Sequence, residues 1–153
     1  MQDQPRKILL TGRSGQFAGV ERRILQEALV LRDMGHDVTI AHTSFPGDHR
    51  LIDQAKSLDI KVFRLDLPPF LHAWRFRHLH YLRYVMQVRH WRFVQSFDLV
   101  HVFMAWSNAG LEHAHLASHF GLSFVVSAHN AFPKAATTPW HRRFLASAFE
   151  YCA

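Results

Sequence analysis

The chain has 153 residues, 48% apolar and 20% charged, which is enough for one domain with a single core and excludes a disordered or low-complexity polar chain. Its 18 Lys and Arg against 12 Asp and Glu give a net charge of +6 with 13 histidines uncounted, which predicts attraction to phosphates, acidic glycans or anionic lipid headgroups. One cysteine excludes an internal disulfide, and without a secretion signal or an apolar run of about 18 residues we expect a cytoplasmic protein.

Short apolar runs alternate with segments of helical periodicity along the chain. In chain order, the first half predicts a strand at 7–11, a helix at 19–34, a strand at 37–42, a helix at 48–58 and a strand at 60–65. The second half predicts a helix at 72–95, a strand at 98–103, a helix from an N-cap at Ser107 to residue 119, a strand at 123–127 and a helix from Pro139 towards the end.

Five short strands separated by helices predict one α/β domain over residues 1–153. Parallel neighbours need right-handed crossovers, so the fold class is a Rossmann-like three-layer domain with a mainly parallel sheet of about five or more strands. In such sheets ligands bind beyond the carboxyl ends of the strands. We therefore expect functional residues in the stretches 12–19, 42–48, 103–107 and 128–133.

The loop at 12–19 ends where the first helix begins. Free N–H groups and the positive end of the helix dipole favour a phosphate there, and Gly15 and Gly19 would let it approach the backbone. The spacing is not the G-x-G-x-x-G of dinucleotide-binding proteins, and the Gly-Lys-Ser/Thr of a P-loop is absent. A purely structural tight turn is the alternative.

Four stretches of this sequence resemble the family 4 retaining glycosyltransferases, also called group 1. They are AGVER at 18–22, LRDMGHDVT at 31–39, DLVH at 98–101 and GLSFVVSAHN at 121–130. They occur in the family's order and separations, and the resemblance covers about residues 7–152. It implies the GT-B arrangement, in which two Rossmann-like domains face each other across a cleft, the first binding mainly the acceptor and the second mainly the sugar nucleotide.

The family's second-domain Glu-x7-Glu signature has no counterpart in this sequence. The resemblance therefore implies an N-terminal, acceptor-side domain whose C-terminal domain or subunit lies elsewhere, and which is inactive on its own. The implied enzyme moves a hexose from a nucleotide sugar to a glycan or lipid-linked acceptor, as in polysaccharide or lipopolysaccharide synthesis, without any other cofactor. A non-catalytic module that recruits or positions a separate catalytic partner is the alternative.

The resemblance also implies roles for residues after the strands. His129 would be the catalytic residue near the reacting sugar, where an imidazole can bond a sugar hydroxyl or stabilise transition-state charge. Its alternative role is that of a histidine bonding loop backbone. Ser107 and Asn130 are the expected acceptor or sugar contacts.

Residues 67–97, here called the basic aromatic segment, contain no acidic residue. Basic residues interleaved with aromatic ones favour contact with an anionic membrane surface, at the inner face of the membrane. The alternative is a solvated helix whose aromatics pack on the sheet, and nucleic acid is disfavoured because no motif that reads it is present. The basic residues expected at that surface are Arg75, Arg77, Arg83, Arg89 and Arg92.

Glu112, His115 and His119 fall on one side of a predicted helix and could begin a metal site. No second set of ligands accompanies them in the sequence. A histidine-rich amphipathic helix is the preferred interpretation, and we expect no metal.

Overall fold

The computed structural model describes residues 4–13, 16–67, 89–104 and 110–129. Its described strands form one five-stranded parallel sheet in the order β3-β2-β1-β4-β5. The strands are β1 (Lys7–Arg13), β2 (Asp37–His42), β3 (Lys61–Arg64), β4 (Leu99–Met104) and β5 (Phe124–Ala128). The expected Rossmann-like α/β fold is therefore confirmed.

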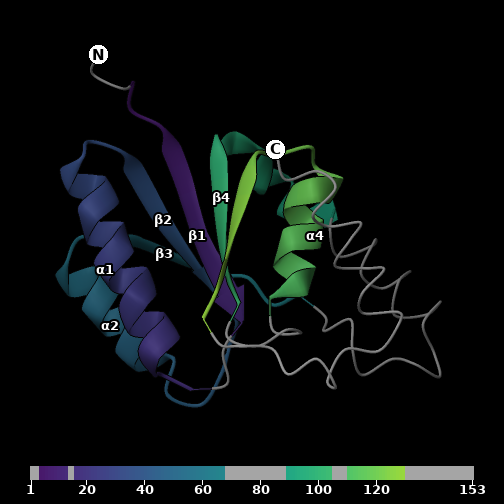
Figure 1. Ribbon diagram of the computed structural model, residues 1–153. Helices are drawn as coiled ribbons and strands as arrows, with labels where there is room; N and C mark the ends of the chain where they lie inside the picture. The colour runs from purple at the N-terminus through teal and green to yellow at the C-terminus, as the bar shows by residue number, and fades with distance from the viewer. Residues whose placement is uncertain (1–3, 14–15, 68–88, 105–109, 130–153) are drawn as a thin grey trace, which may run out of the picture.

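Helices cover both faces of the sheet. The helices α1 (Gly19–Asp33) and α2 (His49–Ser57) lie on one face, and α4 (Leu111–His119) lies on the other, as Figure 1 shows. A 3-10 helix, η2 (Arg89–Ser96), precedes β4. This arrangement follows from the right-handed crossovers that parallel neighbours require, and it gives the three layers expected from the sequence.

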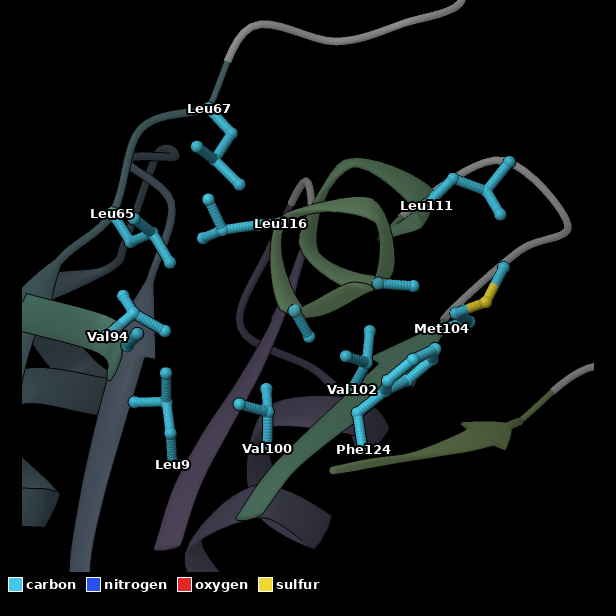
Figure 2. Packing of buried hydrophobic residues seen from close by; sticks show 13 residues of the cluster. Leu9, Leu65, Leu67, Val94, Val100, Val102, Met104, Leu111, Leu116 and Phe124 are labelled. Atoms are coloured by element: carbon cyan, nitrogen blue, oxygen red, sulfur yellow. The ribbon is translucent and has the colours of Figure 1, made fainter. Parts of the chain in front are cut away.

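Alternate residues of the central strands enter two separate cores. Leu9, Val100 and Val102 face α4, where they pack with Leu111 and Leu116 (Figure 2). Their neighbours along the strands turn to the other face and pack beneath α1 and α2, among them Leu10, Ile40 and Phe103. Successive side chains of a strand point to opposite faces, so a sheet covered on both faces needs apolar residues at nearly every position.

Two glycines allow the backbone to pass close to Phe103. Gly12 pairs with Phe103 in the β1–β4 register, and a Cβ on Gly12 would lie 2.5 Å from the Phe103 carbonyl oxygen. Gly110 has a φ of +111°, and its Cβ would lie 3.2 Å from the same oxygen. The sequence thus has glycine at both points where the end of β1 and the start of α4 meet β4.

The structure corrects two expected elements. Ser107 is not the N-cap of the fourth helix, because α4 begins at Leu111 after an N-cap at Gly110, whose left-handed backbone only glycine adopts readily. The described end of the helix expected over 72–95 is the 3-10 helix η2. Residues 68–88 of that prediction, and the helix expected from Pro139, lie outside the described residues.

Candidate functional site

The carboxyl ends of the strands meet at one edge of the sheet, because every described pair of strands is parallel. Arg13 ends β1, His42 ends β2, Met104 ends β4, and His129 follows β5. The N-termini of α1 and α4 reach the same edge, since each helix follows a strand after a loop. This is the edge at which ligands bind in open parallel sheets.

An ion pair joins the central strand to α4 at this edge. Arg13 Nη1 donates to Glu112 Oε1 at 2.6 Å and lies 3.4 Å from the Leu67 carbonyl oxygen. The Glu112 side chain is 1% exposed and that of Arg13 is 27% exposed. Burial raises the pKa of Glu112, while the backbone hydrogen bonds and the charge of Arg13 act in the opposite direction. The pair holds the end of β1, the start of α4 and the segment after β3 together.

A fully buried histidine bridges the strands just below that pair. His113 Nδ1 lies 2.7 Å from Thr11 Oγ1, and its Nε2 lies 3.4 Å from Thr43 Oγ1. The Thr43 hydroxyl donates its proton to the Leu65 carbonyl oxygen, so the network fits a His113 that carries hydrogen on Nε2 and accepts at Nδ1. Burial, and then the charge of Arg13, lower the pKa of His113 to about 3. His113 is therefore a neutral structural group at physiological pH.

The N-terminus of α1 is partly satisfied from within the chain. Glu21, 1% exposed, accepts a hydrogen bond from the Ala18 N–H at 2.7 Å, which is one half of a capping box. Gly19, the first residue of the helix, is exposed, and a Cβ there would meet nothing within 4 Å. Unlike Gly12, Gly19 therefore has no packing reason to be glycine. Gly15, the other expected phosphate contact, lies outside the described residues.

His129 lies at the same edge, directly after β5. Its backbone N–H donates to the Met104 carbonyl oxygen at 3.1 Å, which continues the β4–β5 pairing by one residue. The side chain is exposed, and its ring lies over the buried ring of Phe103 with centroids 5.5 Å apart and planes 12° from parallel. An imidazole fixed on one side and open to solvent on the other can contact a ligand in front of the sheet.

A second carboxylate organises the loop after β2. Asp66 accepts hydrogen bonds from the Ser44 N–H, at 2.7 Å, and from the Arg64 guanidinium. Burial alone would raise the pKa of Asp66, but the Ser44 N–H and the charge of Arg64 outweigh it, so that the pKa is lowered. The Asp66 carboxylate is thus ionised and fixed beside the ends of β2 and β3.

The other expected site residues fall mostly outside the described parts of the chain. Ser107, Asn130, Arg75, Arg77 and Arg83 belong to this group, and Arg89 is described only by its backbone. Arg92 is exposed on η2. Beside it Phe93 is 42% exposed and makes an edge-on contact with Phe63, with ring centroids 4.7 Å apart.

The residues weighed for a metal site have other contacts. Glu112 bonds Arg13, and the rings of His115 and His119 stack with centroids 6.4 Å apart. Across the described ranges, no group of three or more His, Cys, Asp or Glu side chains is placed to hold a metal ion. In the same ranges, no helix has both the length and the apolarity needed to cross a bilayer.

Sequence reasoning missed Arg13, Glu21 and His113. Glu21 stands three residues after the N-cap, as in a capping box, but Ala18 lacks the Ser or Thr side chain that marks that motif in a sequence. The bonds from Arg13 to Glu112 and from Thr11 to His113 span 99 and 102 residues. No local pattern in the sequence predicts contacts between residues so far apart along the chain.

Comparison with known proteins shows which family and which folds the chain is similar to. The family described as "Glycosyl transferase 4-like domain" matches residues 18–152. No curated protein matches the sequence.

Solved structures of low sequence identity share the fold. Anabaena HepE in complex with UDP and glucose superposes with a TM-score of 0.62 at 17% identity, over 97% of this chain and 36% of its own. Acinetobacter baumannii MurG gives 0.63 at 16% identity, over 97% of this chain and 40% of its own. The C-terminal domain of a Pyrococcus furiosus hydrogenase gives 0.53 at 18% identity, over 80% and 90%. The chain thus spans less than half of HepE and MurG, and the fold alone is shared with a protein of another class.

Proposed function

Because this chain belongs to the glycosyl transferase 4-like domain family and has the fold of one Rossmann-like half of a GT-B glycosyltransferase, we propose that it is the acceptor-side, N-terminal domain of a retaining glycosyltransferase. The enzyme would move a hexose from a nucleotide sugar to a glycan or lipid-linked acceptor. The bond from the anomeric carbon to the diphosphate oxygen breaks, and a bond to an acceptor hydroxyl oxygen forms. The proton of that hydroxyl leaves with the nucleoside diphosphate.

The observation that carries this proposal is the exposed imidazole of His129 at the carboxyl edge of the sheet. A ring supported from behind by Phe103 is held in place before a substrate arrives. Hydrogen bonding by such a group to a sugar hydroxyl, as charge develops at the anomeric carbon, costs no reorganisation during the reaction. His129 is therefore the proposed catalytic residue of this domain.

The donor's diphosphate would approach the N-terminus of α1. The first N–H groups of a helix have no partner within it, and the dipole favours negative charge there. Gly19 leaves open space at that position, which suits an oxygen atom coming close to the backbone. Gly15 would act with it, and Ser107 and Asn130 would contact the acceptor or the sugar.

The proposed partner is a second Rossmann-like domain, on the same polypeptide or on another subunit. Support comes from the coverage of 97% of this chain but only 36% and 40% of HepE and MurG. The basic aromatic segment would hold the assembly at an anionic membrane surface, where a lipid-linked acceptor would be located. The adjoining exposed side chains of Arg92 and Phe93 support this role.

The test is transfer of sugar by the complete protein, in which this domain is joined to its second domain. We expect transfer by the complete protein, its loss in His129→Ala, and none by residues 1–153 alone. His119→Ala, which changes an exposed histidine of α4, is the matched control and should transfer at the normal rate. Robust transfer by the isolated chain would overturn the half-enzyme proposal, and a complete protein inactive with every nucleotide sugar would favour the non-catalytic module.

A further inference from the structure

Three aromatic rings form a continuous stack from the middle of the sheet to its carboxyl edge. His101 and Phe103, two residues apart on β4, have ring centroids 4.2 Å apart and planes 25° from parallel. Phe103 and His129 continue the stack with centroids 5.5 Å apart and planes at 12°. We call these three residues the ring column. Its members share the sheet face that carries α1, because Phe103 belongs to the core beneath that helix.

His101 is anchored through both of its ring nitrogens. Nδ1 is hydrogen-bonded to the Glu27 carboxylate on α1, and Nε2 lies 2.7 Å from Ser127 Oγ on β5. A carboxylate only accepts hydrogen bonds, so Nδ1 carries a hydrogen, and Nε2 of the neutral ring accepts from the Ser127 hydroxyl. The plane of the imidazole is therefore fixed by two elements that it does not belong to.

The two hydrogen bonds hold the His101 ring on the side of the ring column where few apolar side chains cover it. Val125, the β5 residue paired with His101, is 48% exposed, so this part of the sheet face is not covered as the centre is. The His101 side chain is 12% exposed and that of Glu27 is 20% exposed. Without the two hydrogen bonds, the imidazole could rotate towards solvent and leave one face of Phe103 bare.

We propose that His101, held by Glu27 and Ser127, is a positioning residue for His129 and acts on it through the ring of Phe103. The anchored imidazole keeps Phe103 in one orientation, and Phe103 is the surface on which the exposed ring of His129 rests. The catalytic importance of the His129 position rests on the proposed function, because it affects the reaction only if His129 contacts the sugar. The placement itself does not depend on it.

The charges around His101 are those of Glu27 and Arg23 on α1 and of His129 after β5. Burial lowers the pKa of His101, the Glu27 carboxylate acts in the opposite direction, and the charges of His129 and Arg23 lower it further. Arg23 also lies 3.8 Å from Glu27. Apart from Glu27, the surroundings of His101 thus favour its neutral form, in which Nδ1 still donates to the Glu27 carboxylate.

The first experiment measures the position of the His129 ring by NMR of the chain labelled in its histidines. The ring protons of His129 should show an upfield ring-current shift from Phe103, assigned by its absence in His129→Gln. We expect His101→Ala to abolish this shift and His101→Phe, which keeps a ring in the column, to retain most of it. His119→Phe, on the opposite face of the sheet, is the control and should leave the shift unchanged.

Two milder variants decide the matter should His101→Ala fail to fold. Glu27→Gln and Ser127→Ala each weaken one anchor and leave all three rings present, and each should reduce the shift part of the way. An unchanged His129 shift in both of these variants would overturn the positioning role, and so would a folded His101→Ala that keeps the shift.

The second experiment separates positioning from the proposed chemistry in the complete enzyme. A small misplacement of a catalytic group can cost on the order of 10²-fold in rate, so we expect His101→Ala to lower kcat by about that factor and His101→Phe to restore most of it. The KM for the acceptor should change little. If His129→Ala itself leaves kcat unchanged, the catalytic role proposed for His129 fails. The NMR experiment would still test whether His101 positions the His129 ring.

Discussion

Arg13 and Glu112 stand 99 residues apart in the sequence, and their side chains meet at 2.6 Å. The contact connects the last residue of the central strand to the first turn of α4. Because Glu112 is buried while Arg13 reaches solvent, the two partners do not contribute equally. Loss of the arginine leaves a buried carboxylate without its guanidinium, whereas loss of the carboxylate leaves an arginine that water can solvate.

We therefore expect Arg13→Met to destabilise the fold more than Glu112→Gln. Removing one partner of a buried pair typically costs about 3 to 5 kcal/mol, and the partial exposure of Arg13 favours the lower end of that range. Glu112→Gln keeps the shape and should cost about 1 kcal/mol. Urea unfolding of both single variants and the double variant measures this. A double variant as unstable as the sum of the two single ones would show that the groups do not interact.

His113 should make the domain sensitive to acid. Its pKa of about 3 in the folded chain lies below the ordinary value of 6.5, so between these values the folded state binds fewer protons than the unfolded state. The stabilising contribution of neutral His113 to the unfolding free energy is fully present above about pH 6.5. It is lost as the pH falls towards 3, by up to about 1.4 kcal/mol per pH unit. His113→Gln should flatten the dependence of unfolding free energy on pH, and His119→Gln should not. Parallel curves for His113→Gln and the unchanged protein would contradict this.

Gly12, in β1, and Gly19, the first residue of α1, should respond in opposite ways to substitution by Ala. Gly12→Ala places a methyl group 2.5 Å from the Phe103 carbonyl oxygen and should destabilise the domain by several kcal/mol, since two backbones must move apart. Gly19→Ala meets nothing and, at the start of a helix, should leave thermal stability equal or slightly higher.

Gly19→Val tests the proposed phosphate contact in the complete enzyme. A branched side chain at this position would meet the donor's diphosphate, so the KM for the sugar nucleotide should rise while acceptor binding stays nearly constant. The domain should unfold at an unchanged temperature because the side chain enters open space. An unaltered KM for the donor would remove Gly19 from the site.

His129→Ala should separate turnover from stability. The exposed side chain contributes little to the core, so the unfolding free energy should change by less than about 0.5 kcal/mol. Loss of one preorganised hydrogen-bond donor lowers kcat by about 10² to 10³. Steady-state kinetics of the complete enzyme, with unfolding measured on the same samples, provides the check. Normal turnover with a normal fold would return His129 to the role of a loop histidine.

Binding to anionic vesicles tests the basic aromatic segment. Charge attraction is screened over about 8 Å at physiological salt, so binding should increase with anionic lipid and weaken as salt rises. Replacing Arg77, Arg83 and Arg92 by Glu should abolish it. The matched control is Arg22→Glu together with Arg23→Glu, which changes exposed arginines of α1. Cosedimentation that is indifferent to lipid charge and to the triple variant would exclude this surface.

The local part of the fold could be predicted from the sequence. Short apolar runs in the sequence predicted β2 at the residues that it occupies. They predicted the other four strands to within two residues at each end. Because parallel strands share one carboxyl edge, the position of His129 at that edge followed as well. These features depend on neighbours along the chain.

What could not be predicted depends on groups that are distant in the sequence. The position of the α4 N-cap at Gly110 rather than at Ser107 reflects the approach of that glycine to Phe103 and Met104. The bonds of His101 to Glu27 and Ser127 require three elements to be packed first. Periodicity identifies which face of a strand is buried, but the partner of a polar side chain on that face is decided by tertiary structure.

The strand order has a consequence for the synthesis of the chain on the ribosome. One side of β1 pairs with β2, but the other side waits for β4, with Ile8 finally opposite Leu99. Translation at about 5 to 20 residues per second delays that pairing by roughly 5 to 20 s. Once β3 has emerged, β1, β2 and β3 can assemble with α1 and α2. At that stage β1 is an edge strand, and its apolar side chains that α4 later covers are still exposed. Between the emergence of β3 and that of β4, the nascent chain therefore has an unpaired apolar strand edge, which is a surface prone to aggregation.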